Sequence, residues 1–214
     1  MISFSSELFL ALSFALPLFL IGVLSPGPAI LAIMLFSAKL GRSRGLVFAL
    51  GISAGSLFWG TVAALGLASL LRTYAEFTIV LRIVGGLYVL WLAFKSLRSA
   101  FKGHTSVPAQ IPEPKKLINL FLSGLMLHLM NSKAIFVWLA VVSVGLGAVV
   151  ESNPLIALSM VLVCWLFSLI AFTAYAVIFS SEPVIAVYRR CARIIDGICG
   201  TFFVAAGLKV ISGR

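Results

Sequence analysis

A lysine in the middle of an apolar stretch is the residue of this sequence best suited to bind a substrate. Lys133 lies roughly midway between Lys116 and Glu151, in a run that is otherwise typical of a membrane helix. A lysine at the centre of such a helix costs about 2.5–3.5 kcal/mol on insertion scales, so its ammonium should face a cavity or a partner. We interpret Lys133 as a substrate-binding residue. The alternative is a structural lysine that satisfies the carbonyl groups of a broken helix.

The stretch Ser25-Pro26-Gly27-Pro28 should break a helix inside the apolar run 8–40. Proline removes a backbone donor and clashes with the preceding turn, so an incoming helix should stop or kink before this stretch. Ser25 is a good N-cap and Pro26 suits the first helical position, so the helix is predicted to restart there. The alternative is a simple proline kink in a packed membrane helix.

A second break is predicted at Asn131 and Ser132, directly before Lys133. Asparagine is another strong N-cap. A restarted helix presents free N–H groups and the positive end of its dipole, and both favour an anion. Two such helix starts beside a lysine suit a carboxylate, so we assign the substrate site to both breaks.

Two more ionisable residues are candidates for ion coupling or for balancing the charge of the lysine. His128 lies one turn before Asn131 and could titrate near neutral pH, although a satisfied interior histidine is the favoured interpretation. Asp196 has two interpretations of equal weight. It either pairs with Arg193 at the membrane interface or faces the cavity as the charge opposite to Lys133.

The composition indicates an all-α protein that crosses a membrane several times. The chain has 214 residues, of which 62% are hydrophobic and 10% charged, with a mean hydropathy of +1.18. Soluble domains have about 25% charged residues. The formal charge of +10 does not indicate nucleic-acid binding, because lysine and arginine fall between apolar runs and form no single patch.

Metal, redox and disulfide chemistry find little support in the residue pattern. Cys164, Cys191 and Cys199 are odd in number and form no CxxC pair, and we interpret them as small core residues. His104 and His128 lie in different parts of the chain, and acidic residues are few. The sequence therefore implies no cofactor and no metal site, and the protein is not expected to be an enzyme.

The apolar runs predict six membrane-spanning helices, the first and fourth of them broken. Their expected ranges are 7–38, 46–71, 77–98, 117–147, 154–180 and 194–212. The first and fourth runs hold about 30 residues, or about 45 Å of straight helix, which exceeds a hydrocarbon core of about 30 Å. Both must tilt steeply or break.

Positively charged residues alternate between the predicted loops. The loops around Arg42, Lys102 and Arg190 are basic, whereas the loop after the fourth run carries only Glu151. Because cytoplasmic loops of membrane proteins are rich in lysine and arginine, we place the three basic loops in the cytoplasm. Both termini are then predicted on the periplasmic or outer side of the bacterial inner membrane.

The chain also contains a weak internal repeat. The segment 18–22 recurs as 120–124, and 82–86 recurs as 193–197, in the same order and at similar offsets. Each half would hold three helices, so the second half must be inverted in the membrane relative to the first. We therefore expect one polytopic domain, 1–214, built from repeats at about 1–100 and 117–214 with a linker at about 101–116.

Small residues at helical spacing predict close helix packing in the second run. Gly51 and Gly55 form one small-xxx-small pair, and Ser56 and Gly60 form another. Such pairs let helix backbones approach closely in lipid. A glycine-lined substrate path is the alternative, and we favour packing.

Several of these motifs occur together, in order, in one family. They are Ser25-Pro26-Gly27-Pro28, Gly41-Arg42-Ser43-Arg44-Gly45-Leu46, Ala49-Leu50-Gly51, Gly55, Asn131-Ser132-Lys133-Ala134 and the region of Gly197. With these motifs the chain resembles the LysE/RhtB family of bacterial amino-acid exporters over nearly its whole length. The resemblance implies a six-helix secondary transporter, driven by the proton gradient as an antiporter.

Two positions depart from the pattern of that family. Gly55-Ser56 stands where the family often has Gly-Asp, and Asn131-Ser132-Lys133 stands where it commonly has Asn-Pro-Lys. The missing aspartate bears on proton coupling and on a preference for cationic substrates. The missing proline softens the second break.

Together these observations predict export of an amino acid or a closely related metabolite. The predicted substrate-binding residues are Ser25, Pro26, Gly27, Pro28, Asn131, Ser132 and Lys133, and the candidates for coupling or counter-charge are Asp196 and His128. The expected partners are a small-molecule substrate and the lipid bilayer, with a homodimer as one candidate assembly and no nucleic acid. A metal or ion exporter and a membrane redox protein are the alternatives.

Overall fold

The computed structural model describes residues 4–25, 27–73, 77–102, 116–149 and 154–212, and every regular element in these ranges is an α-helix. The helices are α1 Phe4–Leu24, α2 Pro28–Leu40, α3 Arg42–Thr73, α4 Phe77–Lys102, α5 Leu117–Leu129, α6 Ser132–Gly147, α7 Pro154–Ile178 and α8 Glu182–Ser212. The predicted all-α class is thus confirmed.

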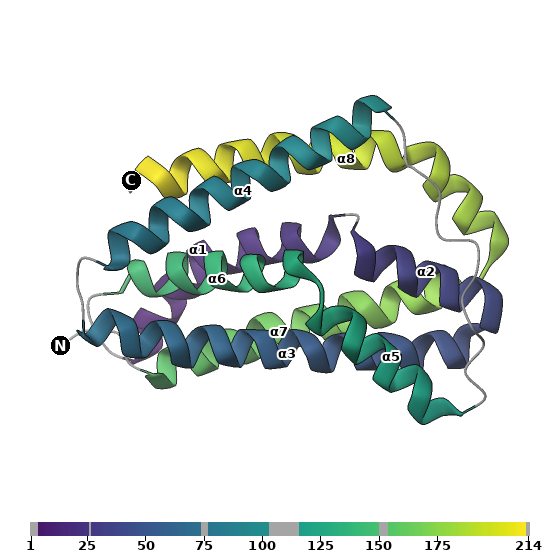
Figure 1. Ribbon diagram of the computed structural model, residues 1–214, viewed down its shortest axis with the longest axis horizontal. Helices are drawn as coiled ribbons and strands as arrows, with labels where there is room; N and C mark the ends of the chain where they lie inside the picture. Colours follow the sequence, from purple (N-terminus) through teal and green to yellow (C-terminus); the bar gives the residue numbers. More distant parts are fainter. Residues whose placement is uncertain (1–3, 26, 74–76, 103–115, 150–153, 213–214) are drawn as a thin grey trace.

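The helices run mainly along the long axis of the molecule, as Figure 1 shows. Both chain ends lie at the left-hand end in that view, together with the end of α3 and the start of α4. The α2–α3 turn, the end of α4, the start of α5 and the α7–α8 turn lie at the opposite end. Both predicted helix breaks fall between these two ends.

Three of the described helices are long and apolar enough to cross a membrane: α1, the segment Arg42–Gly66 of α3, and α7. The helices α5 and α6 pass the same test as a pair, bent by 61° at their junction, and α2 is a shorter apolar helix. The described residues therefore contain three candidate spans, or four if the bent pair is one span. The described part of the chain is therefore all-helical with three or four candidate membrane spans, while six spans in two inverted repeats remain a prediction.

Both predicted breaks are present. The first run is divided into α1, which ends at Leu24, and α2, which begins at Pro28. The fourth run is divided into α5 and α6, and its outer bounds Leu117 and Gly147 coincide with the predicted range 117–147. Local signals were sufficient here, because proline, glycine and asparagine act on the backbone of their own segment.

Two predicted basic loops are wrong in extent. Arg189, Arg190 and Arg193 lie inside α8, which begins at Glu182, twelve residues before the predicted start. No proline or glycine follows Pro183 for more than three turns, so nothing interrupts the helix through the arginines. At the first basic loop only Gly41 is non-helical, and its φ of 84° explains why a glycine ends α2 there.

Closely packed glycines join α3 to α5. A Cβ on Gly51 would collide with the carbonyl oxygen of Phe121, and one on Gly124 would collide with that of Phe48. A Cβ on Gly55 would lie 2.9 Å from the Cβ of His128. The backbones therefore approach closely through glycine, so the packing interpretation of the Gly51 and Gly55 pair is confirmed.

The helices α4 and α8 form a second closely packed pair, seen along the top of Figure 1. Their glycines face each other reciprocally, since a Cβ on Gly86 or on Gly207 would lie 3.2 Å from the carbonyl oxygen of the other. This pair reaches the remaining helices mainly through α6.

The cysteine prediction holds in part. Cys164 is fully buried in the main apolar core, as expected for a small core residue. Cys191 is exposed and Cys199 is half-buried, so the core interpretation is wrong for Cys191. The reason is its place in α8, on a helix face between exposed arginines at positions 190 and 193.

Candidate functional site

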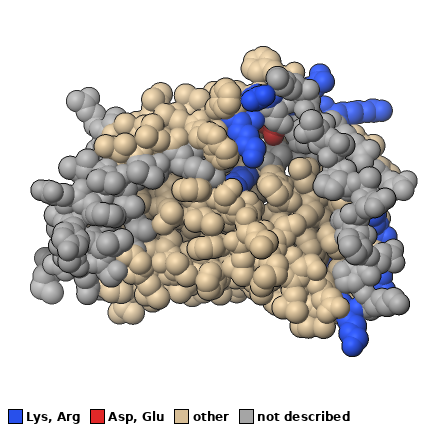
Figure 2. Space-filling view, viewed as in Figure 1, with Lys and Arg blue, Asp and Glu red and all other residues tan. Residues whose placement is uncertain are grey.

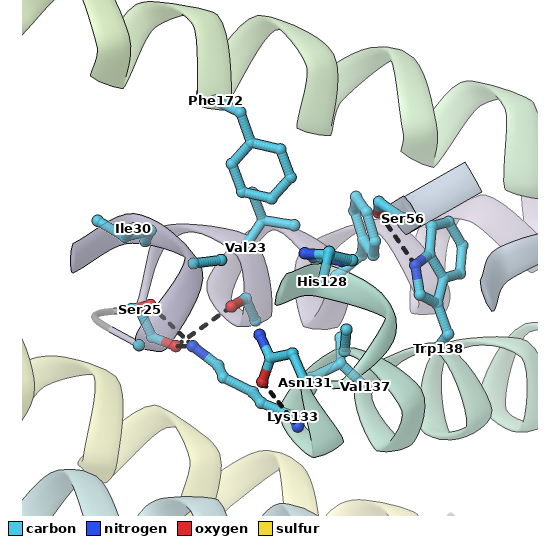
Figure 3. Close-up of a pocket in the computed structure, with 15 residues that line it drawn as sticks. Val23, Ser25, Ile30, Ser56, His128, Asn131, Lys133, Val137, Trp138 and Phe172 are labelled. Atoms are coloured by element: carbon cyan, nitrogen blue, oxygen red, sulfur yellow. Dashed lines mark hydrogen bonds between the residues drawn. The ribbon is translucent and has the colours of Figure 1, made fainter. Parts of the chain in front are cut away.

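A pocket lies where the two helix breaks meet. It holds about 410 Å³ of empty space, counting its open mouth, and its walls come from α1, α2, α3, α5, α6 and α7 (Figure 3). The lining residues are Phe19, Gly22, Val23, Ser25, Gly27, Ala29, Ile30, Ser56, His128, Asn131, Lys133, Ala134, Val137, Trp138 and Phe172. An apolar wall with a few converging polar groups is typical of small-molecule sites.

The first break is built differently from the prediction. The N–H of Ser25 donates to the carbonyl of Ile21 at 2.8 Å, and its hydroxyl donates to the carbonyl of Gly22 at 3.2 Å. Ser25 therefore completes the end of α1, and its predicted role as N-cap is wrong. Gly27 is the N-cap of α2 and Pro28 its first residue. Pro26, predicted at that first position, lies outside the described residues.

The second break is built as predicted. Asn131 is the N-cap of α6, and its Oδ1 accepts a hydrogen bond from the backbone N–H of Lys133 at 3.1 Å. Because an N–H donor occupies the oxygen, the amide nitrogen of Asn131 points the other way, into the pocket in Figure 3. Asn131 thus holds the helix start and offers donors to the cavity.

Lys133 connects the two breaks. Its Nζ donates to the carbonyl oxygen of Ser25 at 2.8 Å and to the Ser25 hydroxyl at 2.5 Å, across 108 positions of sequence. This contact agrees with the alternative interpretation of Lys133, a structural lysine that satisfies a carbonyl group at a broken helix. An ammonium has three N–H groups, however, and these two bonds leave one of them for a ligand. Both roles are therefore open to the same side chain.

The predicted substrate residues divide into two groups. Ser25, Gly27, Asn131 and Lys133 line the pocket together. Pro28 and Ser132 do not line it, and both are exposed. Each of these two opens a helix and sets the backbone of the break, so its influence on the pocket is indirect.

His128 is an interior residue, but not a satisfied one. Its side chain is 5% exposed and lies edge-on to the ring of Phe172, with 5.9 Å between the ring centroids. Its Nδ1 is buried without a hydrogen-bond partner among the described residues. An unsatisfied buried polar atom costs about 1–3 kcal/mol, so this nitrogen calls for a partner.

Asp196 lies behind the pocket, on α8. Its side chain is 2% exposed and does not line the pocket, but it interacts electrostatically with the ammonium of Lys133. Arg193, the other candidate partner, is exposed. The geometry therefore agrees with Asp196 as a charge opposite to Lys133 and places it outside the cavity wall.

The pocket also contains residues that were not predicted as site residues. The indole Nε1 of Trp138 donates to the hydroxyl of Ser56 at 3.1 Å, and both side chains are buried. The rings of Phe19 and Trp138 pack at 4.6 Å between centroids. Ser56 carried a signal, because it differs from the pattern of the resembled family. For the aromatic residues nothing in the sequence indicated a place in the site, because they differ in no visible way from other hydrophobic residues of the apolar runs.

The arrangement can bind a small molecule that has a charged head and a compact body. The ammonium of Lys133 and the amide of Asn131 offer donors at one end of the pocket, and the rest of the wall is mostly apolar. No group of three or more His, Cys, Asp or Glu side chains that could hold a metal ion occurs in the described part of the chain. The pocket therefore suits an organic anion or a zwitterion.

Comparisons with known proteins place the chain among transporters. The family described as LysE type translocator matches residues 20–214. The threonine efflux protein of Escherichia coli (strain K12) is 30% identical over 196 residues, which cover 91% of this chain and 94% of that protein. The threonine efflux protein of Salmonella typhi is 28% identical over 201 residues, with the same coverage.

A leucine efflux protein of Enterobacter sp. (strain 638) is 27% identical over 192 residues, which cover 89% of this chain and 90% of that protein. No solved structure matches the chain.

Proposed function

The chain belongs to the LysE family of translocators, and on that basis we propose that it exports a small amino acid or a close relative across the bacterial inner membrane. Relatives of nearly the same length are named threonine and leucine efflux proteins. The observation that carries the proposal is the pocket between the two helix breaks, where Lys133 and Asn131 converge.

The carboxylate of the substrate binds the donor end of the pocket. Lys133 keeps one N–H for it beyond the two bonds to Ser25, and Asn131 adds its amide N–H groups. The N-termini of α2 and α6 contribute the positive ends of their dipoles. Hydrogen bonds to charged groups contribute about 1.5–3 kcal/mol each, enough to fix a carboxylate in an otherwise apolar cavity.

The ammonium group of the substrate needs acceptors nearby. The carbonyl of Ser25 lies at the pocket wall, where a carbonyl oxygen with two lone pairs can accept a second bond. The buried carboxylate of Asp196, which acts on the same end of the pocket through Lys133, adds favourable negative charge. Both charged groups of a zwitterion can therefore be bound within one short region of the pocket.

Six spans arranged as two inverted repeats suit this site. Each predicted span packs against its counterpart in the other half: α4 on α8, α3 on α7 and α1 on α6. The first run and the fourth run pass through the molecule in opposite directions in Figure 1. Inverted repeats with broken helices place substrate sites at the repeat interface, and the pocket lies between the two breaks.

The cytoplasmic side is assigned to the end of the molecule where the basic residues gather. Arg42, Arg44, Lys116 and Arg190 are exposed there. Figure 2 shows lysine and arginine side chains from the middle of this face to its right-hand end, and one of them lies in a hollow. Both termini lie at the other end in the same view, so this orientation puts them on the outer side.

Proton-coupled antiport is the proposed driving mechanism. Asp196 and His128 are the buried candidates for carrying the proton, because both are ionisable and lie beside Lys133 or in the pocket.

Export is tested in cells and in purified form. Cells that overproduce the protein should accumulate at least one amino acid in the medium relative to cells with an empty vector. Purified protein in liposomes should release the same amino acid, and an inward proton gradient should speed its release. If a broad survey of the medium finds no amino acid that depends on the protein, the amino-acid proposal fails.

A further inference from the structure

Binding of a substrate carboxylate by Lys133 and Asn131 does not explain why the Nδ1 atom of His128 is buried without a partner in the described part of the chain. It is buried, without a hydrogen-bond partner among the described residues, on a side chain that lines the pocket. Burying a polar atom in this state is unfavourable, so its retention at the wall of a cavity points to a partner that arrives with the ligand.

The place of His128 along the pocket indicates which part of the ligand it meets. α1 and α6 pack antiparallel, since Gly22 faces Val137, while Ser25 contacts Lys133 and Phe19 contacts Trp138. With a rise of about 1.5 Å per residue, the six positions from Ser25 to Phe19 span about 9 Å along α1. Figure 3 shows His128 between these two ends.

A substrate held by its carboxylate at the Lys133 end therefore extends its side chain past His128 toward Trp138. The far end is closed by aromatic rings and by Ser56, whose hydroxyl oxygen already accepts the bond from the indole of Trp138. Between these two ends, His128 contributes a buried ring nitrogen that has no hydrogen-bond partner among the described residues.

We propose that His128 selects amino acids whose side chain carries a hydroxyl or an amide over aliphatic amino acids of the same size. A hydroxyl both donates and accepts, so it satisfies Nδ1 whichever ring nitrogen carries the proton, and an amide offers both functions as well. An aliphatic side chain leaves Nδ1 unsatisfied, and sites built to hydrogen-bond a substrate group discriminate against analogues that lack it. This inference rests on the proposed export function.

Matched substrate pairs test the selection directly. Threonine and valine differ by a hydroxyl in place of a methyl group, and asparagine and leucine differ similarly by an amide. Counterflow of each labelled amino acid into proteoliposomes gives a polar-to-aliphatic ratio for the protein. One net hydrogen bond corresponds to a ratio of roughly 2- to 10-fold in favour of the polar member.

Three variants separate the hydrogen bond from general pocket shape. His128→Leu should bring the ratio to about 1, and His128→Asn should restore part of it, because the asparagine side chain places a polar atom near the position of Nδ1. Phe172→Leu is the matched control: it alters the ring that packs on His128 but removes no polar atom, so both members of a pair should change together.

The outcomes are distinct for the two proposals. If the wild type carries amino acids but shows no preference within either pair, or if His128→Leu keeps the preference, the role of His128 is refuted while export stands. If the wild type carries no amino acid at all, the export proposal fails and this inference fails with it. If thermal stability in detergent shows that His128→Leu does not fold, His128→Asn takes its place: a ratio below that of the wild type and of Phe172→Leu supports the role of His128, and an unchanged ratio refutes it.

Discussion

Replacing Lys133 by methionine separates the two roles of this side chain. The substitution keeps the apolar stem but removes the ammonium that donates to both oxygens of Ser25. Two hydrogen bonds to a charged group, at about 1.5–3 kcal/mol each, amount to about 3–6 kcal/mol. Removing a lysine charge from a membrane helix returns about 2.5–3.5 kcal/mol. The net loss of stability is therefore expected to be small, from about zero to about 3 kcal/mol.

The effect on substrate binding has no such compensation. The variant loses the third N–H, which we assign to the substrate carboxylate and which contributes about 1.5–3 kcal/mol. At 1.4 kcal/mol for each factor of ten, affinity should fall about 10- to 100-fold. The prediction is thus a protein that folds nearly as well as the wild type and binds its substrate far more weakly.

The assay measures both quantities on the same preparations. Thermal stability in detergent reports the fold, and efflux from proteoliposomes at several substrate concentrations reports affinity. Lys116→Met is the matched control, because Lys116 is exposed beside the start of α5 and lies outside the pocket. It should leave both quantities unchanged.

Two results would contradict this reasoning. A Lys133→Met protein that is stable and transports with wild-type affinity would remove Lys133 from the substrate site. A protein that cannot be recovered folded, while Lys116→Met is normal, would contradict the expected small loss of stability and show that the fold requires the contact with Ser25.

Other predictions follow from the orientation, the packing and the second break. In a background without native cysteines, an impermeant thiol reagent on intact cells should label Ser6→Cys and leave Arg42→Cys unlabelled; the reverse pattern contradicts the assigned orientation. Gly51→Ala should lower stability by about 1–3 kcal/mol, because its Cβ meets the backbone of α5. Gly197→Ala, with no atom within 4 Å of the new Cβ, should be tolerated. Asn131→Ala removes a helix cap and should cost about 0.5–2 kcal/mol of stability in detergent.

The main features of the helical architecture could be predicted from the sequence because they depend on local chemistry. Asn131 caps α6 as predicted, and the run that it divides begins at Leu117 and ends at Gly147 as predicted. The Gly51 spacing correctly indicated close packing. Asparagine, proline and glycine act on the backbone of their own segment, so no distant contact is needed to interpret them.

Some local predictions failed because two local signals competed. Ser25 has the side chain of an N-cap, but its N–H already belongs to α1, so Gly27 takes that place at the start of α2. The arginines before the last predicted span suggested a loop, yet arginine is a good helix former and α8 continues through them from Glu182.

The composition of the site was decided by the tertiary structure. Lys133 meets Ser25 across 108 positions, and Trp138 meets Ser56 across 82. Neither contact follows from spacing along one helix, because each depends on how separate helices pack. The sequence alone determined that a lysine lies inside an apolar run and must find a partner there. Only the packing of α1 against α6 decided that this partner is the end of a broken helix, and only the approach of α3 and α5 placed His128 in the same cavity.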